Sequence, residues 1–393
     1  MSEAEGSQPE RGATRADRPA RAPDGLSEEP EMTPVSRWRA PGRMNLIGEH
    51  TDYNDGYVLP LALPFATTAT VGARTDGVLT ARSTRHGDAE LRVADLAPGR
   101  VDGWSAYVAG VVWAFGEAGH DVAGGADVAV DSDVPEGAGL SSSAALECSV
   151  AAALDELLGL GLDRTALARL ARRAENDFVG APTGVMDQMA SLLCTDAHVL
   201  FLDCRTLATE QVPFDADAVG LAVLGVDSRS PHQLTSGPYA DRRRSCEQAA
   251  RVLGVPALRD ATEADLDRLD GELLRRARHV VTENARVLAT VAALRAGRVA
   301  DIGPLLSASH TSMRDDFEIT VPRVDLIAAT AEAAGALGAR MTGGGFGGCV
   351  LALVPVDRLD GVRSAIADAY DRAGYGEPGF FPAVPSAGAR RIG

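Results

Sequence analysis

Residues 137–146 read GAGLSSSAAL, in which two glycines and three serines stand directly before an alanine-rich apolar stretch. Glycine lets the backbone approach an anion closely, and the first turn of a helix offers unsatisfied N–H groups and the positive end of the helix dipole. Gly137 and Gly139 therefore predict a loop that holds a triphosphate, with a serine hydroxyl turned toward a divalent cation. A second interpretation stays open, because serines at this place also serve as ordinary N-caps.

The chain contains no lysine among its 393 residues, and all 38 basic side chains are arginine. Without an ε-amino group there is no Walker A loop, no strand lysine of a protein kinase and no Schiff base to pyridoxal phosphate or a carbonyl substrate. Phosphate must therefore be bound by backbone N–H groups, hydroxyls, a metal ion and arginine.

The overall composition narrows the choice of partners. A formal net charge of −17 argues against nucleic acid, which requires a clustered basic face. No apolar run reaches the roughly 20 residues that cross a bilayer, and the N-terminus lacks the apolar segment of a signal peptide. The five cysteines show no CxxC pair, which is typical of a reducing cytoplasm. We expect a cytoplasmic monomer with small-molecule partners, and neither nucleic acid nor membrane among them.

Composition divides the chain into three parts. Residues 1–31, rich in Arg, Glu, Pro, Gly and Ser, are expected to form a disordered extension. Two domains follow, at 32–208 and 209–393, each long enough for its own core. Within 36–71, apolar runs on both sides of Asn54-Asp55-Gly56 predict two strands joined by a polar connection.

The remaining pattern alternates strands and helices. ADVAVDSDV predicts a strand before the serine-rich loop, and the helix after this loop is expected to end at Gly159 and Gly161. DRTALARLARRAENDF predicts a second helix that Gly180 ends, and a short third helix is expected to begin at Thr183. HVLFLDC and LAVLGVDS predict strands on either side of the domain boundary. The second domain is expected to be helical from about Ala240, before the loop and strand of RMTGGGFGGCVLALVPV.

Two acids follow the predicted phosphate loop. Mg²⁺ is usually held by one or two carboxylates together with phosphate oxygens, and Glu175, beside the apolar face of the second helix, is a candidate ligand. Its other interpretation is an exposed helix carboxylate next to Arg172. Asp187 lies in the first turn of the third helix, where the dipole favours the ionised carboxylate. It is therefore either a group that orients or deprotonates a hydroxyl, or only a stabilising first-turn acid.

The connection between the first two strands is rich in polar groups. Arg43, in APGRMN, precedes an apolar strand, where a guanidinium needs water or a carboxylate partner. Glu49, His50 and Asp52 follow shortly after. Two acids and one histidine at this spacing are a weak metal signal. They are better suited to sugar recognition, since carboxylates accept hydrogen bonds from neighbouring hydroxyls.

Four segments of the chain resemble the signatures of the GHMP small-molecule kinases. In chain order they are APGRMNLIGEHTDYNDGYVLPLAL, VPEGAGLSSSAALE, AENDFVGAPTGVMDQ and MTGGGFGGCV. The first segment resembles the branch of this family that phosphorylates galactose. The match runs from about Arg39 to the last strand, and it includes LTSGPYADRRRSCE, TENAR and MRDDFEITVP.

The resemblance implies an α+β fold of two domains, with the active site in the cleft between them. The N-terminal domain would resemble the second domain of ribosomal protein S5, and the C-terminal domain would be ferredoxin-like. The implied reaction is phosphorylation of the anomeric hydroxyl of α-D-galactose by ATP, with Mg²⁺ as cofactor. Asp187 matches the catalytic position near that hydroxyl, and Arg43 the position beside it. Ser143 and Glu175 match the ligands of Mg²⁺.

The same match implies the binding residues. The ATP phosphates would be bound by the loop residues Gly137, Ala138, Gly139, Leu140, Ser141, Ser142 and Ser143. The positions that contact the sugar match Glu49, His50, Thr51, Asp52, Gly184 and Tyr239. Ser83 falls near a nucleotide-contacting position of some members.

The sequence departs from the family pattern at two positions. Glu136 stands where relatives often have an uncharged residue, and it is expected to turn outward because a carboxylate pointing at ATP would repel it. Thr183 stands where some relatives have cysteine, a change compatible with helix capping.

Two other functions stay open. One is another kinase of the family, acting on N-acetylgalactosamine, arabinose or mevalonate. The other is a non-catalytic protein that binds ATP and galactose to regulate a partner. Such proteins can lose the serine and alanine of the phosphate loop, whereas Ser143 and Ala144 are present here. This favours the enzyme.

Overall fold

A mixed sheet organises the first half of the chain. The structure is a computed structural model that describes residues 36–230 and 236–392, so the predicted extension at 1–31 lies outside the described residues. Within them the sheet has the strand order β13-β1-β3-β6-β4-β5. Its strands are β1 (Ser36–Asn45), β3 (Pro60–Ala73), β4 (Val78–Ser83), β5 (Gly87–Arg92), β6 (Gly125–Ser132) and β13 (Arg390–Arg391). Neighbouring strands are antiparallel except β4 and β6, which are parallel.

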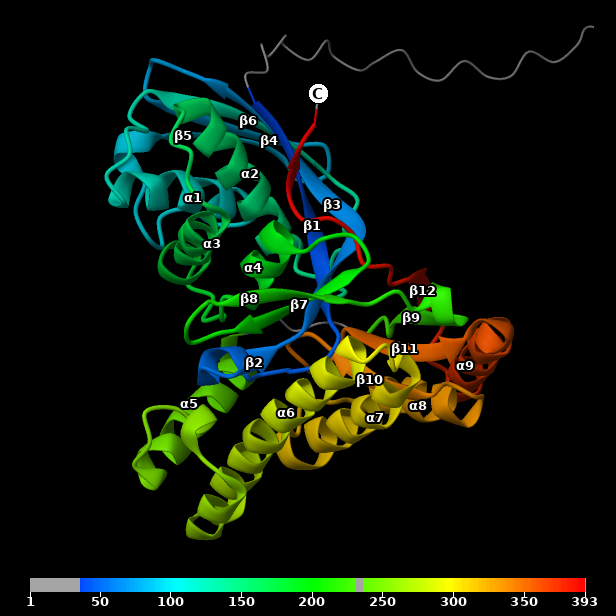
Figure 1. Ribbon diagram of the computed structural model, residues 1–393. Helices are drawn as coiled ribbons and strands as arrows, with labels where there is room; N and C mark the ends of the chain where they lie inside the picture. The colour runs from blue at the N-terminus through cyan, green and yellow to red at the C-terminus, as the bar shows by residue number, and fades with distance from the viewer. Residues whose placement is uncertain (1–35, 231–235, 393) are drawn as a thin grey trace, which may run out of the picture. The chain divides into compact units, whose positions relative to one another are not determined.

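Helices cover one face of this sheet (Figure 1). They are α1 (Ser105–Glu117), α2 (Ser142–Leu158), α3 (Arg164–Arg173), continued by a π-helical turn at Ala174–Val179, and α4 (Met186–Leu193). The predicted end at Gly180 is confirmed by its left-handed φ of 88°. The predicted start of the third helix at Thr183 is wrong, since α4 begins at Met186. The hydroxyl of Thr183 donates to Glu175, and its carbonyl accepts from Asn176 instead of from a helix N–H group.

A four-stranded antiparallel sheet organises the second half, with the order β10-β11-β9-β12. Its strands are β9 (Leu221–Asp227), β10 (Gly338–Thr342), β11 (Cys349–Pro355) and β12 (Gly379–Pro382). The helices of this half are α5 (Ser236–Leu253), α6 (Gly271–Arg295), α7 (Gly303–Ser312), α8 (Pro322–Ala333) and α9 (Leu359–Ala373). Helices α7 and α8 pack on β10, while α6 lies between α5 and α7 (Figure 1). Among the described helices, none combines the length and apolar character needed to cross a bilayer.

A shared apolar core joins the two halves. A small sheet of β2 (Tyr57–Val58), β7 (His198–Asp203) and β8 (Thr209–Pro213) contacts β3 on one side and α6 on the other. Met44 and Leu61, from β1 and β3, belong to one buried cluster with Val287 of α6 and Leu351 of β11. The last strand, β13, also returns to pair with β1. The domain boundary at 208/209 stays a prediction. Residues from both sides of this boundary pack in the same apolar cluster.

Side chains of the second half hold the loop that follows β1, residues 46–56. Arg340 of β10 is fully buried and donates Nη1 to the carbonyls of Asn45 and Leu46 at 3.0 and 3.1 Å. Nε2 of His279, on α6, lies 3.0 Å from the carbonyl of Glu49. Main-chain carbonyls in and next to this loop therefore find their hydrogen-bond partners among side chains of the second half.

We predict that Arg340→Ala lowers the free energy of unfolding by about 3–5 kcal/mol, because it leaves buried carbonyls and the Glu49 carboxylate without their cationic partner. Urea unfolding measures the change. Arg251→Ala is the control: it removes an exposed arginine from α5 and should change stability by no more than about 0.5 kcal/mol. Equal effects of the two substitutions would contradict the assignment.

Candidate active site

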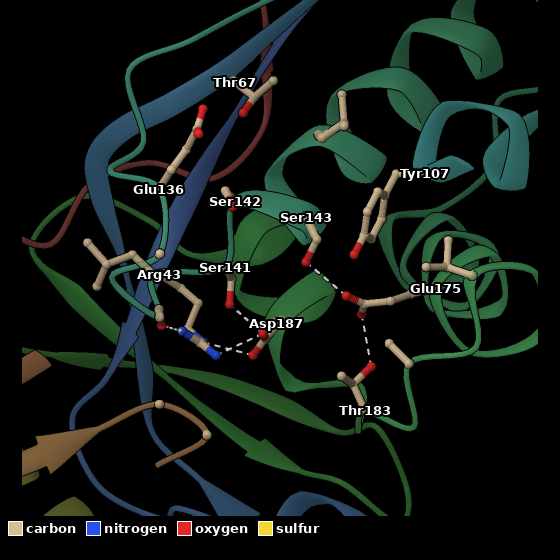
Figure 2. A pocket seen from close by; sticks show the side chains of 18 of the residues that line it. Arg43, Thr67, Tyr107, Glu136, Ser141, Ser142, Ser143, Glu175, Thr183 and Asp187 are labelled. Atoms are coloured by element: carbon tan, nitrogen blue, oxygen red, sulfur yellow. Dashed lines mark hydrogen bonds and ion pairs between the residues drawn. The ribbon is translucent and has the colours of Figure 1, made fainter. Parts of the chain in front are cut away.

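Arg43 and Asp187 form a bidentate ion pair in the wall of a cavity (Figure 2). Nε and Nη2 of Arg43 donate to Oδ1 and Oδ2 of Asp187 at 2.7 and 2.8 Å, and the two side chains are only 7% and 20% exposed. Nη1 donates to the carbonyl of Gly139 at 2.8 Å, and the Ser141 hydroxyl also donates to Asp187. Burial lowers the pKa of Arg43, but the charges of Asp187 and Glu49 outweigh it and raise this pKa overall. The carboxylate partner that Arg43 needs is Asp187.

A bulge in β1 places Arg43 against the serine-rich loop. The pairing of β1 with β3 shifts register between Pro41 and Arg43. A Cβ atom on Gly42 would lie 2.6 Å from the carbonyl of Leu140, so only glycine allows the strand to approach the loop this closely. The N–H of Arg43 donates to the same carbonyl at 3.1 Å.

The serines of the loop make bonds other than a helix cap. Ser141 is the N-cap residue of α2, has a left-handed φ of 58° and makes no side-chain cap bond. Its hydroxyl donates to Asp187, and the Ser143 hydroxyl donates to Oε1 of Glu175 at 2.8 Å. The cap interpretation of Ser141 is therefore wrong. The first-turn N–H groups of α2 have no intrahelical partners and can receive an anion.

Glu175 is buried and faces Ser143 (Figure 2). Its side chain lies on the π-helical turn and the residue is 4% exposed. Oε2 accepts from the Thr183 hydroxyl at 2.8 Å and from Nε2 of Gln188 at 2.7 Å. Burial raises the pKa of Glu175. The alternative of an exposed carboxylate beside Arg172 is therefore wrong.

Ser143 and Glu175 offer oxygen ligands, which Mg²⁺ prefers. Oγ of Ser143 and Oε1 of Glu175 are 2.8 Å apart. Residues 36–230 and 236–392 contain no group of three or more His, Cys, Asp or Glu that could hold a metal ion. A pair of protein oxygens fits Mg²⁺ bound together with phosphates and water, since this ion usually keeps such ligands.

Four of the six residues predicted to bind sugar, Glu49, His50, Thr51 and Asp52, lie on the loop between β1 and β2. Glu49 is 2% exposed and accepts from the N–H of Gly343 at 2.6 Å; burial raises its pKa. His50 has a left-handed φ of 60°, and its Nδ1 lies 2.6 Å from the Tyr53 hydroxyl. Burial lowers the pKa of His50 to about 3, so the ring is neutral. The loop therefore presents a buried acid and a neutral imidazole.

Two further segments meet this loop. A Cβ atom on Gly184 would lie 1.8 Å from Oδ2 of Asp52, so the contact requires glycine. Burial raises the pKa of Asp52 to about 6, and the neighbouring charge of Asp187 adds to the shift. The Tyr239 ring, on α5, packs against His50 with ring centroids 5.0 Å apart. Three segments far apart in the sequence thus supply one wall.

A cavity of about 690 Å³ connects the serine-rich loop (residues 137–143), the Arg43–Asp187 ion pair and the loop between β1 and β2. We call this last loop, residues 46–56, the sugar loop. Every residue predicted for the site lines it except Thr51 and Ala138. The Thr51 hydroxyl donates to the carbonyls of Gly48 and Tyr57, and Ala138 is 1% exposed, so both face the protein. Ser83, at the end of β4, lies on the wall. The individual roles assigned to these residues stay predictions.

Glu136 lies at the edge of the cavity and points away from the Arg43–Asp187 pair (Figure 2). Its side chain is 48% exposed, and its Oε1 lies 3.4 Å from Nη1 of Arg85 and 3.1 Å from Nε2 of His86. Its charge is thus directed to the turn between β4 and β5.

Several residues of this region are not predicted by the sequence patterns. Trp104 and Tyr107 line the cavity, but aromatic residues in an apolar helix are usually core residues. Gln188 and Glu147 are fully buried beside Glu175. A signal existed for Glu147, because a residue four positions after Ser143 lies on the same face of a helix.

Comparison with known proteins identifies the family. Family models match at residues 29–73 (galactokinase galactose-binding signature), 106–195 (GHMP kinases N terminal domain) and 290–372 (GHMP kinases C terminal). A galactokinase of Streptomyces coelicolor is 53% identical over 367 residues, which cover 91% of this chain and 95% of the relative. This chain belongs to the galactokinase family of GHMP kinases. A galactokinase of Mycobacterium tuberculosis is 52% identical over 344 residues, covering 86% of this chain and 94% of that one.

Solved structures of the family share the fold. The crystal structure of Lactococcus lactis galactokinase complexed with galactose matches with a TM-score of 0.87 and 34% identity, over 92% of this chain and 96% of that chain. A mevalonate kinase of Methanococcus jannaschii matches with a TM-score of 0.64 and 14% identity, covering 93% and 100%, which shows the fold alone. The predicted α+β, two-domain GHMP kinase fold is confirmed. As a kinase of the galactokinase family, the chain takes ATP as phosphoryl donor.

We predict that Arg43→Lys lowers kcat about tenfold or more, because one ammonium group cannot pair with both oxygens of Asp187 and also bond Gly139. Steady-state kinetics with ATP and the sugar measure the effect. The control is Arg39→Lys on the same strand, whose guanidinium makes a surface ion pair with Asp133 at 2.9 Å. It should stay within about twofold of the unmodified enzyme. A similarly small change for Arg43→Lys would contradict the prediction.

Proposed function

We propose that this member of the galactokinase family transfers the γ-phosphoryl group of ATP to the anomeric hydroxyl of α-D-galactose, giving α-D-galactose 1-phosphate and ADP. One observation carries the proposal: the phosphate loop and the sugar loop both reach the same ion pair. Arg43 bonds the carbonyl of Gly139 and Ser141 bonds Asp187, while Asp52 lies close enough to Asp187 for their charges to interact. The Lactococcus lactis relative was crystallised with galactose.

The serine-rich loop would hold the nucleotide end. The N–H groups of residues 137–143 and of the first turn of α2 would bind the phosphates, since the helix dipole favours negative charge there. Ser143 and Glu175 would hold Mg²⁺, which neutralises charge on the phosphates when bound. The transition state of phosphoryl transfer is loose, so positioning and charge neutralisation dominate, and Arg43 supplies a fixed positive charge for this purpose.

The sugar loop would hold galactose. The carboxylates of Glu49 and Asp52 accept hydrogen bonds from sugar hydroxyls, the neutral His50 offers one more polar contact, and the Tyr239 ring closes the wall. Thr51 faces the loop's own carbonyls, so its role is to shape the loop.

Asp187 would receive the anomeric hydroxyl. The C1 oxygen would bond to the γ-phosphorus as the bond from that phosphorus to the bridging oxygen breaks. ADP would leave with that oxygen, and the hydroxyl proton would pass to an oxygen of the transferred phosphoryl group and from there to water. Three donors, two from Arg43 and one from Ser141, already occupy the Asp187 oxygens. This favours a role in orienting the hydroxyl and compensating charge over a role as the final proton acceptor.

We also propose that the enzyme acts in the cytoplasm. All five cysteines belong to the described residues and are free thiols, and four of them are buried. A reducing compartment preserves such thiols, and ATP is available there as co-substrate. The monomeric state stays a prediction.

A coupled ADP-release assay tests the substrate. Galactose, N-acetylgalactosamine, glucose, arabinose and mevalonate are compared, and galactose is expected to give the highest kcat/KM. The isosteric Asp187→Asn variant controls for background ATP hydrolysis, and its rate with galactose should be about 10²-fold lower because the hydroxyl is no longer held in position. Activity with another acceptor but not with galactose would contradict the proposal that galactose is the substrate. Binding of ATP and galactose without turnover would indicate a sensor.

The pKa of Asp52 predicts how galactose use depends on pH. Because the ionised carboxylate accepts sugar hydroxyls and the pKa is about 6, kcat/KM for galactose should fall as pH drops below this value, by about tenfold per unit once the protonated form dominates. Asp52→Asn should lower kcat/KM and remove this acid limb. The pH profile of both enzymes measures the effect, and an unchanged limb in Asp52→Asn would assign it to another group.

A further inference from the structure

One oxygen of the Glu175 carboxylate faces Ser143, the other proposed metal ligand, and the second oxygen is held by two other hydrogen-bond donors. Oε1 faces the Ser143 hydroxyl at 2.8 Å. Oε2 instead accepts from the Thr183 hydroxyl at 2.8 Å and from Nε2 of Gln188 at 2.7 Å (Figure 2 for Thr183). The two oxygens of one carboxylate therefore have different surroundings.

Gln188 is itself fixed in place. It is fully buried on α4, next to Asp187, and its Nε2 also lies 3.3 Å from Oε2 of Glu147. Glu147 is fully buried on α2, one turn after Ser143. An amide nitrogen with two hydrogens thus bridges two carboxyl groups, and its packing leaves it little freedom to move. Of the two donors to Oε2 of Glu175, Thr183 is the one on a loop.

The Thr183 loop is built so that the hydroxyl reaches Glu175. Nδ2 of Asn176 donates to the carbonyl of Thr183 at 3.0 Å, which ties the loop to the π-helical turn that carries Glu175. Oγ1 of Thr183 also lies 2.9 Å from Oδ1 of Asn176, so its one proton is placed between two acceptors. The chain thus brings a hydroxyl donor to the carboxylate from eight residues away.

We propose that Thr183 is a positioning residue for the Mg²⁺ of this kinase: its hydroxyl, together with Gln188, fixes Oε2 of Glu175 so that Oε1 faces the cation beside Ser143. The inference rests on the proposed metal site of Ser143 and Glu175. A carboxylate free to rotate would lose conformational freedom when the ion binds, whereas one already oriented does not.

The test measures how strongly the metal ion and the nucleotide support each other's binding. A non-hydrolysable ATP analogue is titrated calorimetrically into the full chain, once with Mg²⁺ and once with a chelator. The Kd with the chelator divided by the Kd with Mg²⁺ gives the coupling. Thr183→Val keeps the shape of the side chain but removes the donor, and should lower this ratio about tenfold. Thr183→Ser keeps the hydroxyl and should stay within about twofold. The Kd without metal should not change in either variant.

Ser143→Ala and Glu175→Gln separate this inference from the metal site on which it rests. Both should lower the same ratio. If neither does, the proposed metal site is wrong. If both do but Thr183→Val keeps the original ratio, Thr183 has no positioning role. Thermal unfolding confirms that each variant is folded, and Thr183→Ala replaces Thr183→Val if the latter is not. A loss that Thr183→Ser shares in full would show a packing role for the side chain and overturn the inference.

Discussion

The buried ion pair of Arg43 and Asp187 is the interaction on which the rest of the site depends. A charge left alone at this depth would cost several kcal/mol, so each side chain requires the other. The partners come from β1 and α4, 144 residues apart in sequence. Because Arg43 also bonds Gly139, and Ser141 also bonds Asp187, the pair fixes the sheet, the helix and the phosphate loop in one arrangement.

A second set of buried charges fixes the sugar loop from the other half of the molecule. Arg340 is bonded to carbonyls at the end of β1 and start of the loop, and Glu283 of α6 accepts from the N–H of Gly48 at 3.0 Å. Burial would raise the pKa of Glu283, but neighbouring groups, above all the charge of Arg286, lower it to about 2, so it is ionised at neutral pH. Both ends therefore depend on both halves: the sugar loop through Arg340 and Glu283, and the serine-rich loop through Cys349 of β11, whose thiol donates to the carbonyl of Ala138 at 3.1 Å. Phosphoryl transfer would take place where these constraints meet.

Local sequence patterns predicted much of the fold, including the loop before α2. The turn at Asn54-Asp55-Gly56, the end at Gly180 and the strand after the last glycine-rich loop are encoded by neighbouring residues, and all three are present. The start of α4 was predicted three residues early, because the hydrogen bonds of Thr183 to Glu175 and Asn176 replace those of a helix. Such competition between side chain and helix is settled by partners that the local pattern does not include.

By itself the sequence determined the chemistry that the site could use. A chain without lysine must bind phosphate through backbone N–H groups, hydroxyls, metal and arginine, and the four ordered motifs identified the family. Only the tertiary structure decided the environment of each group. Glu175 is buried rather than exposed and accepts hydrogen bonds from Gln188 and Thr183, and Ser141 bonds Asp187 rather than its own helix. The physical reason is that burial and hydrogen-bond partners arise from packing between distant segments, and packing sets the charge and orientation of a side chain.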